Sequence, residues 1–132
     1  MLKKIPVRPE STNALYRGGR RYKTDKYKHY TNNTLLWLPD ADISEYKGID
    51  KALYITFYVH NKVRDTDNMV KPFQDVLANK YGFNDKDIVF LQISKVHIPK
   101  TEEEGTAFVL SLHGEGKKEL VKYGDMNTKN PT

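Results

Sequence analysis

Three segments of the chain have the hydrophobic patterning of β-strands. Residues 52–60, 87–98 and 106–113 are rich in β-branched and aromatic side chains, and polar or glycine-containing segments separate them. The Glu-rich turn between the last two segments predicts that they form a hairpin. Residues 2–7 predict a further short strand, so we expect a small sheet of about three to four strands.

One segment between these strands has the apolar spacing of a helix. It begins at Thr66 or Asp67, residue types that favour a helix start, and extends to about Lys80. Within it the apolar side chains fall on one helical stripe: Val70, Phe73 and Leu77. Gly82 follows and predicts the end of the helix.

The remaining segments carry mixed signals. Residues 31–50 combine apolar side chains, including Trp37, which we expect in the core, with Pro39 and scattered aspartates that interrupt a long helix. We therefore expect this segment to be irregular. A chain of 132 residues that is 38% hydrophobic can build one modest core. The predicted fold is α+β (mixed α/β): a single domain over residues 1–132, with one main helix after the Asp-x-Asp motif.

The composition restricts both the chemistry and the compartment. The chain has no cysteine, which excludes disulfides, thiolate metal sites and a cysteine nucleophile, and which suits a reducing compartment. Its apolar runs are too short to span a bilayer, and the N-terminal residues lack the apolar segment of a signal peptide. We expect a cytoplasmic protein with no membrane partner.

Positive charge is concentrated near the N-terminus. Residues 1–28 contain nine Lys or Arg and two acidic residues, whereas the rest of the chain contains 13 basic and 15 acidic residues. Within a basic arm at about residues 16–30, cations alternate with tyrosines, a composition typical of a nucleic-acid-binding surface; a solvated basic loop is the alternative. The candidate DNA-binding residues are Tyr16, Arg17, Arg20, Arg21, Tyr22, Lys23, Lys26 and Lys28. At the other end, a polar tail of about residues 115–132 predicts at most a short helix.

Acidic residues recur around the predicted helix. At intervals of four along one stripe of the helix lie Asp67, Lys71 and Asp75. Further acids stand just before the helix and at the start of the next strand: Asp65, Asp85 and Asp87. If that strand pairs beside residues 52–60, its beginning could come near the start of the helix and gather these carboxylates into one cluster. Such a cluster favours a hard divalent cation, Mg²⁺ or Mn²⁺, and together with a basic surface it suits phosphodiester hydrolysis.

Structural roles are the alternative for each of these residues. One residue at the helix start could cap the helix, Lys71 and Asp75 could form an exposed ion pair, and the two later aspartates could be turn residues. An EF-hand loop counted from Asp65 is excluded, because hydrophobic residues stand at positions that require Asp or Asn, Gly and Glu.

Two stretches together resemble the RusA family of Holliday junction resolvases: RDTDNMVKPFQDVL (64–77) and NDKDIVFLQISK (84–95). The family shows Asp-x-Asp-Asn, a lysine four residues after the second Asp, and another Asp four residues later. An Asp-Asp pair then precedes a strand that ends in Lys. Residues 8–24 are similar to the family's N-terminal Pro/Ser/Asn, Tyr and Arg pattern, so the resemblance extends from Pro9 to about Lys95.

The resemblance implies a homodimeric enzyme of DNA recombination and repair. Such an enzyme binds four-way DNA (Holliday) junctions and cuts them symmetrically with Mg²⁺ or Mn²⁺, and small resolvases of this type suit a phage or prophage. By the same resemblance, Asp65, Asp67 and a later aspartate hold the metal. Lys71 is then an essential basic residue, and Asp75 matches a further acid of the motif.

The later acidic position departs from the family pattern. Where the family has two adjacent acids, this chain has Asn84 and Asp85, followed by Lys86 and Asp87. Alignment of the following strand, at the cost of a shorter loop around Gly82, makes Asp85 the third ligand, with Asp87 as the alternative. An alignment without that shortening places Lys86 there.

Two other classes of function remain open. The protein could be a non-catalytic nucleic-acid-binding module with structural aspartates, which predicts DNA binding unaffected by Asp67→Asn and no cleavage. It could also be a metal-dependent phosphohydrolase of small substrates, which predicts turnover of a nucleotide and weak DNA binding.

Overall fold

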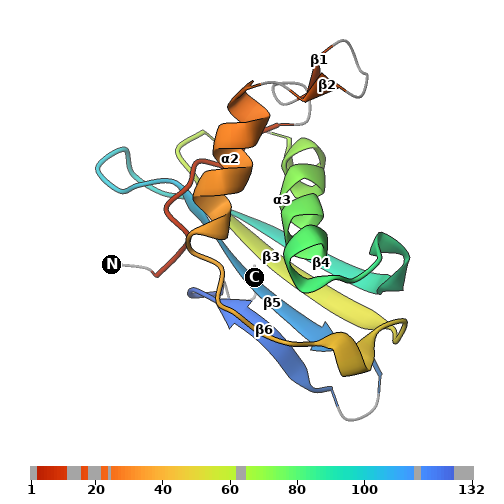
Figure 1. Cartoon of the computed structure of the whole chain (residues 1–132). Coiled ribbons are helices and arrows are strands. Elements are labelled where there is room, and N and C mark those ends of the chain that lie inside the picture. Colours follow the sequence, from red (N-terminus) through yellow and green to blue (C-terminus); the bar gives the residue numbers. More distant parts are fainter. Residues whose placement is uncertain are drawn as a thin grey trace.

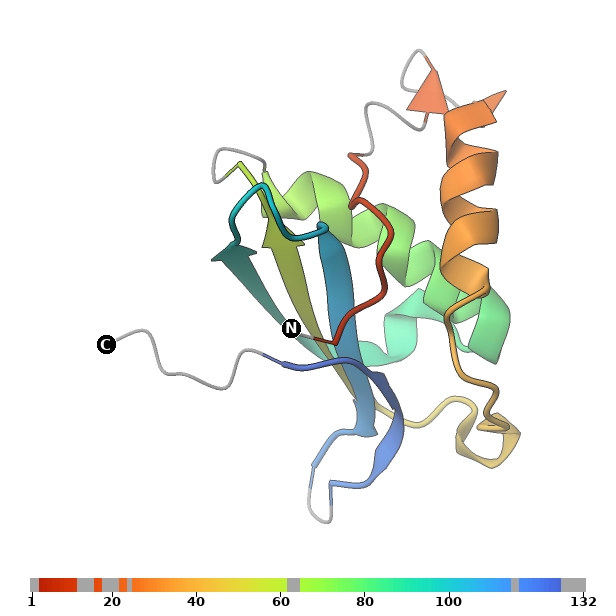
Figure 2. The same cartoon turned by 90° about the vertical axis from the view of Figure 1, so that its left-hand side faces the viewer.

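Two helices cover one face of a four-stranded mixed sheet in the computed structural model, which describes residues 3–11, 16–17, 22–23, 25–61, 65–114 and 117–126 (Figures 1 and 2). The predicted α+β class is confirmed. Within the described residues, neither helix is long and apolar enough to cross a membrane. In chain order the elements are β1 (Tyr16–Arg17), β2 (Tyr22–Lys23), α2 (Asp25–Leu35), the 3₁₀ helix η1 (Ser44–Tyr46), β3 (Lys51–Val59), α3 (Thr66–Tyr81), the 3₁₀ helix η2 (Asp85–Asp87), β4 (Ile88–His97), β5 (Gly105–Leu112) and β6 (Glu119–Tyr123).

A parallel β-α-β unit forms the centre of the fold. Strand β3 pairs in parallel with β4, and α3 connects them across one face of the sheet. Because a helix between parallel neighbours must run back along the sheet, α3 begins beside the C-terminal ends of the two strands and finishes beside their N-terminal ends. The predicted helix and its end are confirmed: Gly82 adopts a left-handed conformation, with φ of 73°, and its amide donates to the carbonyl oxygen of Ala78.

The core lies between α3 and the sheet. Phe73 on α3 lies between Phe57 of β3 and Phe108 of β5, with edge-on ring contacts at centroid distances of 6.4 and 5.7 Å. Strand β3 is buried along almost its whole length, because it has a neighbour on each side and α3 above it. The apolar stripe predicted for the helix is therefore the face that holds it to the sheet.

The predicted hairpin between residues 87–98 and 106–113 is wrong. The sheet order is β4-β3-β5-β6, so β3 separates the two strands that were expected to pair, and β5 pairs antiparallel with β3. The burial of the strands explains this order. Strand β3 is hydrophobic on both faces and takes the central position, whereas β4 is exposed at most of its positions and takes the edge.

Helix α2 occupies Asp25–Leu35, where the sequence predicted a loop followed by irregular structure. Its buried residues are Tyr30 and Thr34, and the hydroxyl of Thr34 donates to the carbonyl of Tyr30 at 2.7 Å. Burial, with the charge of Glu10 nearby, raises the pKa of Tyr30. Two buried positions one turn apart are too few to produce a helical hydrophobic pattern in the sequence.

The two ends of the described chain also differ from expectation. The polar tail contains β6, which pairs with β5 and buries Val121. The predicted strand at residues 2–7 is reduced to a single bridge between Ile5 and Thr106. Val121 and backbone pairing hold the first segment, whereas the buried side chains of Lys4 and Ile5 hold the second together with the bridge to Thr106.

Candidate functional site

Asp65 caps the N-terminus of α3. Its side-chain oxygen accepts a hydrogen bond from the backbone amide of Asp67 at 3.0 Å. The sequence predicted Thr66 or Asp67 at the helix start, and the structure places the cap at Asp65. The positive end of the helix dipole stabilises both exposed carboxylates at this position.

A groove of about 300 Å³ runs between α3 and β4. One wall carries the predicted stripe of charged residues on α3, together with one aspartate of η2. Apolar side chains of β4 form the other wall. Because residues four apart on a helix lie above one another, the stripe presents its charges in a row. The charged lining residues are Asp67, Lys71, Asp75 and Asp85.

Lys71 lies between two acids of the groove. Its Nζ atom is 3.7 Å from a carboxylate oxygen of Asp75, and its side chain is 61% exposed. An exposed pair of this kind contributes little to stability and breaks readily. Lys71 therefore keeps the freedom to turn toward another anion that enters the groove.

Asp85 and Asp87 point to different surroundings. Asp85 is exposed and lines the groove, whereas a carboxylate oxygen of Asp87 lies 3.9 Å from the ammonium of Lys51. Lys51 is fully buried and donates to the carbonyls of Tyr46 and Ile49 at 2.7 and 2.9 Å. Of the two candidates for the later acidic position, the structure brings only Asp85 into the groove.

The acidic residues do not gather at the start of the helix as expected. Strand β4 does pair beside β3, but because the two are parallel its beginning lies near the end of α3. Asp67 in the first turn and Asp75 are about 12 Å apart along the helix axis, and Asp85 follows the last turn. In the described part of the chain, no three His, Cys, Asp or Glu side chains are placed to hold one metal ion together.

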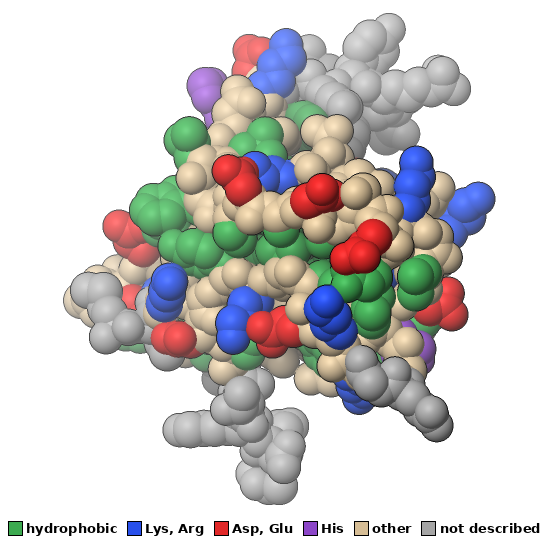
Figure 3. Space-filling model, turned by 60° about the horizontal axis from the view of Figure 1, so that its bottom comes forward, with side chains coloured by type: hydrophobic (Ala, Val, Ile, Leu, Met, Phe, Trp, Pro, Cys, Tyr) green, Lys and Arg blue, Asp and Glu red, His purple; other side chains and the backbone are tan. Residues whose placement is uncertain are grey.

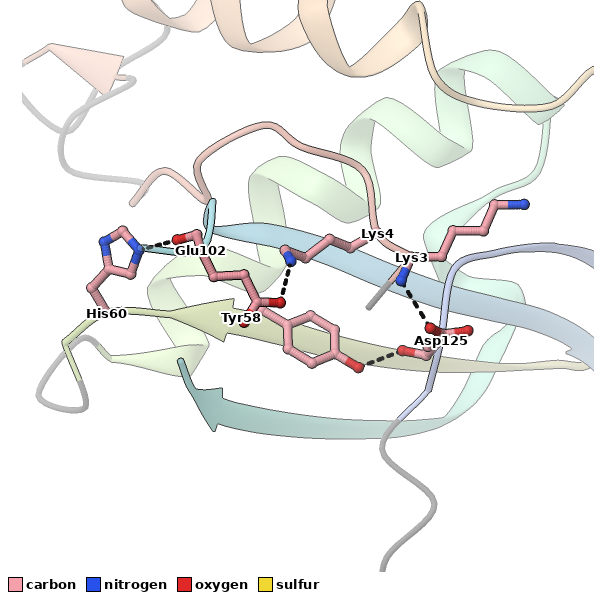
Figure 4. Close-up of polar contacts among 6 residues, drawn as sticks. All are labelled: Lys3, Lys4, Tyr58, His60, Glu102 and Asp125. Atoms are coloured by element: carbon pink, nitrogen blue, oxygen red, sulfur yellow. Dashed lines mark hydrogen bonds and ion pairs between the residues drawn. The ribbon is translucent and has the colours of Figure 1, made fainter. Parts of the chain in front are cut away.

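The end of β3 that leads toward Asp65 is held by the turn between β4 and β5 (Figure 4). The backbone amide of His60 donates to Glu104 at 2.7 Å, and its Nε2 lies 2.6 Å from the carbonyl oxygen of Glu102. Because a carbonyl only accepts, Nε2 carries the hydrogen. Lys4 forms an ion pair with the Glu102 carboxylate at 3.0 Å. The Glu-rich turn thus fixes the backbone position from which the chain approaches the acidic motif.

Tyr58 extends the same set of contacts on the far face of β3. Its hydroxyl donates to the backbone carbonyl of Asp125, and the ammonium of Lys4 lies over its ring, 5.5 Å from the ring centre. Burial raises the pKa of Tyr58, and the charge of Asp125 adds to the effect. Segments from both ends of the described chain therefore meet at the strand that precedes the acidic motif.

The opposite end of α3 is tied to the segment after α2. The hydroxyl of Tyr81 donates to the carbonyl of Pro39, and Lys80 forms an ion pair with Asp40 at 2.8 Å. The hydrogen bond from Lys80 lowers the pKa of Asp40, and burial raises the pKa of Tyr81 to about 12. The Tyr81 hydrogen bond holds the end of α3 to the segment after α2, whereas the Asp40 carboxylate is 98% exposed and its ion pair adds little.

The basic arm is described in part. Strands β1 and β2 pair antiparallel, with Tyr16 opposite Lys23 and Arg17 opposite Tyr22, while Arg20 and Arg21 lie outside the described residues. Lys26 and Lys28 stand exposed on the first turns of α2. On the face shown in Figure 3, by contrast, acidic and basic side chains are interspersed among hydrophobic ones, so this face presents no single sign of charge.

A second groove was missed from the sequence because Trp37 was expected in the core. Trp37 is 44% exposed and Leu36 is 82% exposed, whereas Leu38 is buried. Trp37 lines a groove of about 340 Å³ between α2 and residues 6–10. The sequence signal that could have indicated this groove is the occurrence of aromatic side chains close to a cluster of cations.

No family model matches the chain, and no curated protein matches it.

Proposed function

We propose that the protein is a metal-dependent endonuclease that resolves four-way DNA junctions, as its resemblance to the RusA family implies. The observation that carries this proposal is the groove beside α3, which is lined by Asp67, Lys71, Asp75 and Asp85. Carboxylates and a lysine in one open groove can serve hydrolysis of a phosphodiester, and an exposed groove admits a polymer that a closed pocket would exclude.

The carboxylates suit a hard divalent cation. Asp65, Asp67 and Asp85 would hold Mg²⁺ or Mn²⁺, because carboxylate oxygens are the ligands these ions prefer. When bound, such an ion activates water and stabilises the leaving oxygen. Asp65 has a second task in this scheme, since one of its oxygens already accepts the capping hydrogen bond at the helix start.

Lys71 would stabilise the negative charge that develops on the phosphate. It stands one turn after Asp67 in the same groove, and its ion pair with Asp75 spans 3.7 Å. An ammonium that leaves a loose ion pair to meet a phosphate in the transition state lowers the barrier, because it binds the reacting state more strongly than the ground state.

The basic arm would hold the DNA backbone. The arm leads directly into α2, so its cations are attached to a rigid element of the domain. Cations that displace counterions from phosphates provide affinity without sequence preference, which is what an enzyme needs if it recognises the shape of a junction.

A homodimer would supply the two active sites that paired cuts require. Strand β4 lies at the edge of the sheet, and three of its consecutive side chains are exposed hydrophobics: Val89, Phe90 and Leu91, at 49, 41 and 42%. A long apolar edge strand pairs readily with another strand. A second copy in antiparallel pairing would satisfy this edge and would place the acidic start of each β4 near Lys95 of the other copy.

Such a dimer would also explain why the aspartates of one chain lie far apart along the groove. In antiparallel pairing, the start of the partner strand lies beside the end of β4, where α3 begins. The partner's Asp85 would then approach Asp65 and Asp67, which are separated from Asp85 of their own chain by the length of α3. A metal site shared between two chains accounts for the lack of a three-carboxylate group in the described part of one chain.

A nucleic-acid-binding module without catalysis is the second candidate, and two observations favour it. Asp65 caps a helix, and Asp75 pairs with Lys71, so both have structural roles. The two candidates differ in what Asp67 does, since its exposed carboxylate has no required structural role at the helix start.

One experiment separates them. Labelled four-way junction and a matched duplex are incubated with the protein in Mg²⁺, in Mn²⁺ and in EDTA, beside the Asp67→Asn variant. We expect the protein to make paired cuts in the junction but not in the duplex, and only when Mg²⁺ or Mn²⁺ is present. The Asp67→Asn variant should make no cuts. Junction binding without cleavage in any metal would favour the non-catalytic module.

A further inference from the structure

The outer face of α2 carries a row of side chains outside the acidic groove. At helical spacings of three and four, one stripe contains Lys26, His29, Asn33 and Trp37. Trp37 lies two residues beyond the end of α2, and its backbone amide still donates to the carbonyl of Thr34 at 3.0 Å. The backbone of Trp37 is therefore fixed to the end of α2, while its indole side chain is almost half exposed.

The row forms one wall of a groove, and the N-terminal segment forms the other. Pro6, Val7 and Arg8 stand opposite the helix, and the volume of about 340 Å³ lies in the range of small-ligand sites. Trp37 and Leu36 provide an apolar surface at one end, and Arg8 and Lys26 provide positive charge elsewhere in the lining. The groove thus combines a flat aromatic surface, an amide and cations.

The two cations are only loosely held by their own carboxylates. Arg8 lies 3.4 Å from Glu104 and Lys26 lies 3.5 Å from Glu10, while the two basic side chains remain 67 and 54% exposed. The two carboxylates are only 9 and 15% exposed, but each cation keeps more than half of its side-chain surface open to solvent, so both cations can still attract a further anion. Only one of the two carboxylates, Glu10, lines the groove itself.

We propose that this groove binds an unpaired segment of a DNA strand, with one base stacked on Trp37 and neighbouring phosphates beside Arg8 and Lys26. Sites for single strands combine a positive groove with aromatic side chains on which bases stack, and this groove has both. The choice of DNA as the nucleic acid rests on the proposed function, but none of the residues of the acidic groove takes part.

Charge favours a nucleic-acid strand over a protein segment as the occupant. The groove lies on the helix that continues the basic arm, and Lys28 adds a further exposed cation on α2. A polyanion therefore meets mostly positive charge from the arm to the groove, where Asp25 and Glu10 are the acidic residues among these cations. The apolar part of the groove is formed mainly by Leu36 and Trp37.

Trp37 is the only tryptophan in the chain, so its fluorescence reports on this groove alone. The full-length protein is titrated with a twelve-nucleotide oligothymidine, about the length that single-strand sites cover, and with a blunt duplex of the same length. We expect saturable quenching of the tryptophan by the single strand and much weaker quenching by the duplex. The double variant Arg8→Ala/Lys26→Ala is expected to need more single strand for the same quenching.

A second measurement follows the DNA instead of the protein. The anisotropy of a labelled oligothymidine is expected to show about 5- to 150-fold weaker binding to Trp37→Ala, the usual range for loss of one stacked base. Ile49→Ala is the matched control, since Ile49 is 45% exposed and does not line the groove. Binding by Ile49→Ala should equal that of the unchanged protein.

Three results would overturn the proposal: unchanged tryptophan emission while the strand binds, equal affinity of Trp37→Ala and Ile49→Ala, or equal quenching by strand and duplex. Junction cleavage distinguishes these failures from failure of the proposed function. If the protein cuts junctions but its Trp37 fluorescence does not change with single-stranded DNA, it has the enzyme activity without this site. A protein whose Trp37 responds to single strands but which cuts nothing has this site without the enzyme activity.

Discussion

The grooves beside α3 and beside α2 belong to the same helical layer but carry opposite chemistry. The first is lined by three carboxylates and a lysine, and the second by an indole, an amide and two cations against one carboxylate. A groove rich in carboxylates repels a polyanion unless a cation is bound, whereas a basic aromatic groove attracts one. This difference leads us to expect DNA cleavage at the α3 groove and DNA binding at the α2 groove. Variants in each groove should therefore separate cleavage from binding.

The largest effect is expected from the acids at the start of α3. Asp67→Asn and Asp65→Asn should each abolish junction cleavage while junction affinity is kept or raised, because the substitution removes a metal ligand and a repulsive charge together. Asn is as good a helix cap as Asp, so Asp65→Asn keeps α3 intact. Cleavage assays and binding titrations on the same samples measure the two quantities.

Glu103→Gln serves as the control, since Glu103 is exposed on the turn between β4 and β5, outside the acidic groove. Cleavage by Asp67→Asn at close to the normal rate would remove catalysis from the α3 side and end the proposed division.

This side of the molecule is also the part that the sequence predicted best. The motif is contiguous, and the helical stripe, Gly82 and the strand at β3 each gave a local signal that the structure confirms. Local patterns predict an element and the face it presents, because both depend on residues within a few turns.

The relation between Asp85 and the start of the helix was not predictable in the same way. It depends on whether β4 pairs in parallel or antiparallel with β3. The residues of β4 are compatible with either arrangement, and only the order of strand, helix and strand favours the parallel one. The groove beside α2 is harder still, since it joins residues 6–10 to Trp37, with a long segment between them. Non-local pairing and an exposed tryptophan leave no periodic signal in the sequence.

The second prediction asks whether the acidic groove is completed by another chain. Asp67→Asn and Asp85→Asn homodimers should both be inactive. In a mixed dimer with shared sites, one site carries both substitutions and the other carries none, so nicking of one strand should return. Mixing the two variants under conditions that permit subunit exchange, then measuring nicked junction, tests this.

Asp67→Asn mixed with Asp67→Asn/Asp85→Asn is the control mixture, because no site in it is free of substitutions. Continued inactivity of the first mixture, with heterodimers demonstrated by differential tagging, would place all ligands of a site within one chain.

The third prediction concerns Lys71. Lys71→Ala should reduce the rate of cleavage in the bound complex by about 100- to 1,000-fold, since it removes charge stabilisation at the reacting phosphate. Single-turnover kinetics at saturating protein measure that rate without the contribution of binding. Lys100→Ala removes an exposed lysine outside the groove and should leave the rate unchanged. If Lys71→Ala only weakened DNA binding and left the cleavage rate unchanged, Lys71 would belong to the DNA-binding residues.

The fourth prediction moves to the DNA-binding side. Replacing Arg17, Arg20, Arg21 and Lys23 together by Ala should weaken binding to every DNA and flatten its salt dependence by up to about 0.9 per lost contact on a log–log plot. Single-turnover cleavage at saturating protein should survive, because no acidic residue is changed. Salt titrations of junction binding measure the slope, and light scattering measures whether the complex is a dimer. Equal slopes for the variant and the unchanged protein would remove the arm from the DNA interface.

The smallest effect is expected where the two sides are joined, at the end of α3. The hydroxyl of Tyr81 donates to the carbonyl of Pro39, and burial raises its pKa from 10.0 to about 12. A raised tyrosine pKa means that this contact stabilises the fold fully below pH about 10 and ceases to do so as pH rises through about 12. Tyr81→Phe should therefore lower the free energy of unfolding by about 1 kcal/mol at pH 8, the usual worth of one hydrogen bond, and should reduce the further loss above pH 10. Urea unfolding at several pH values measures both effects, with Tyr54→Phe as the control for loss of a hydroxyl elsewhere on the sheet. If Tyr81→Phe and the unchanged protein lost stability in parallel above pH 10, the Tyr81 hydrogen bond would not be the alkaline-sensitive contact between α3 and the segment after α2.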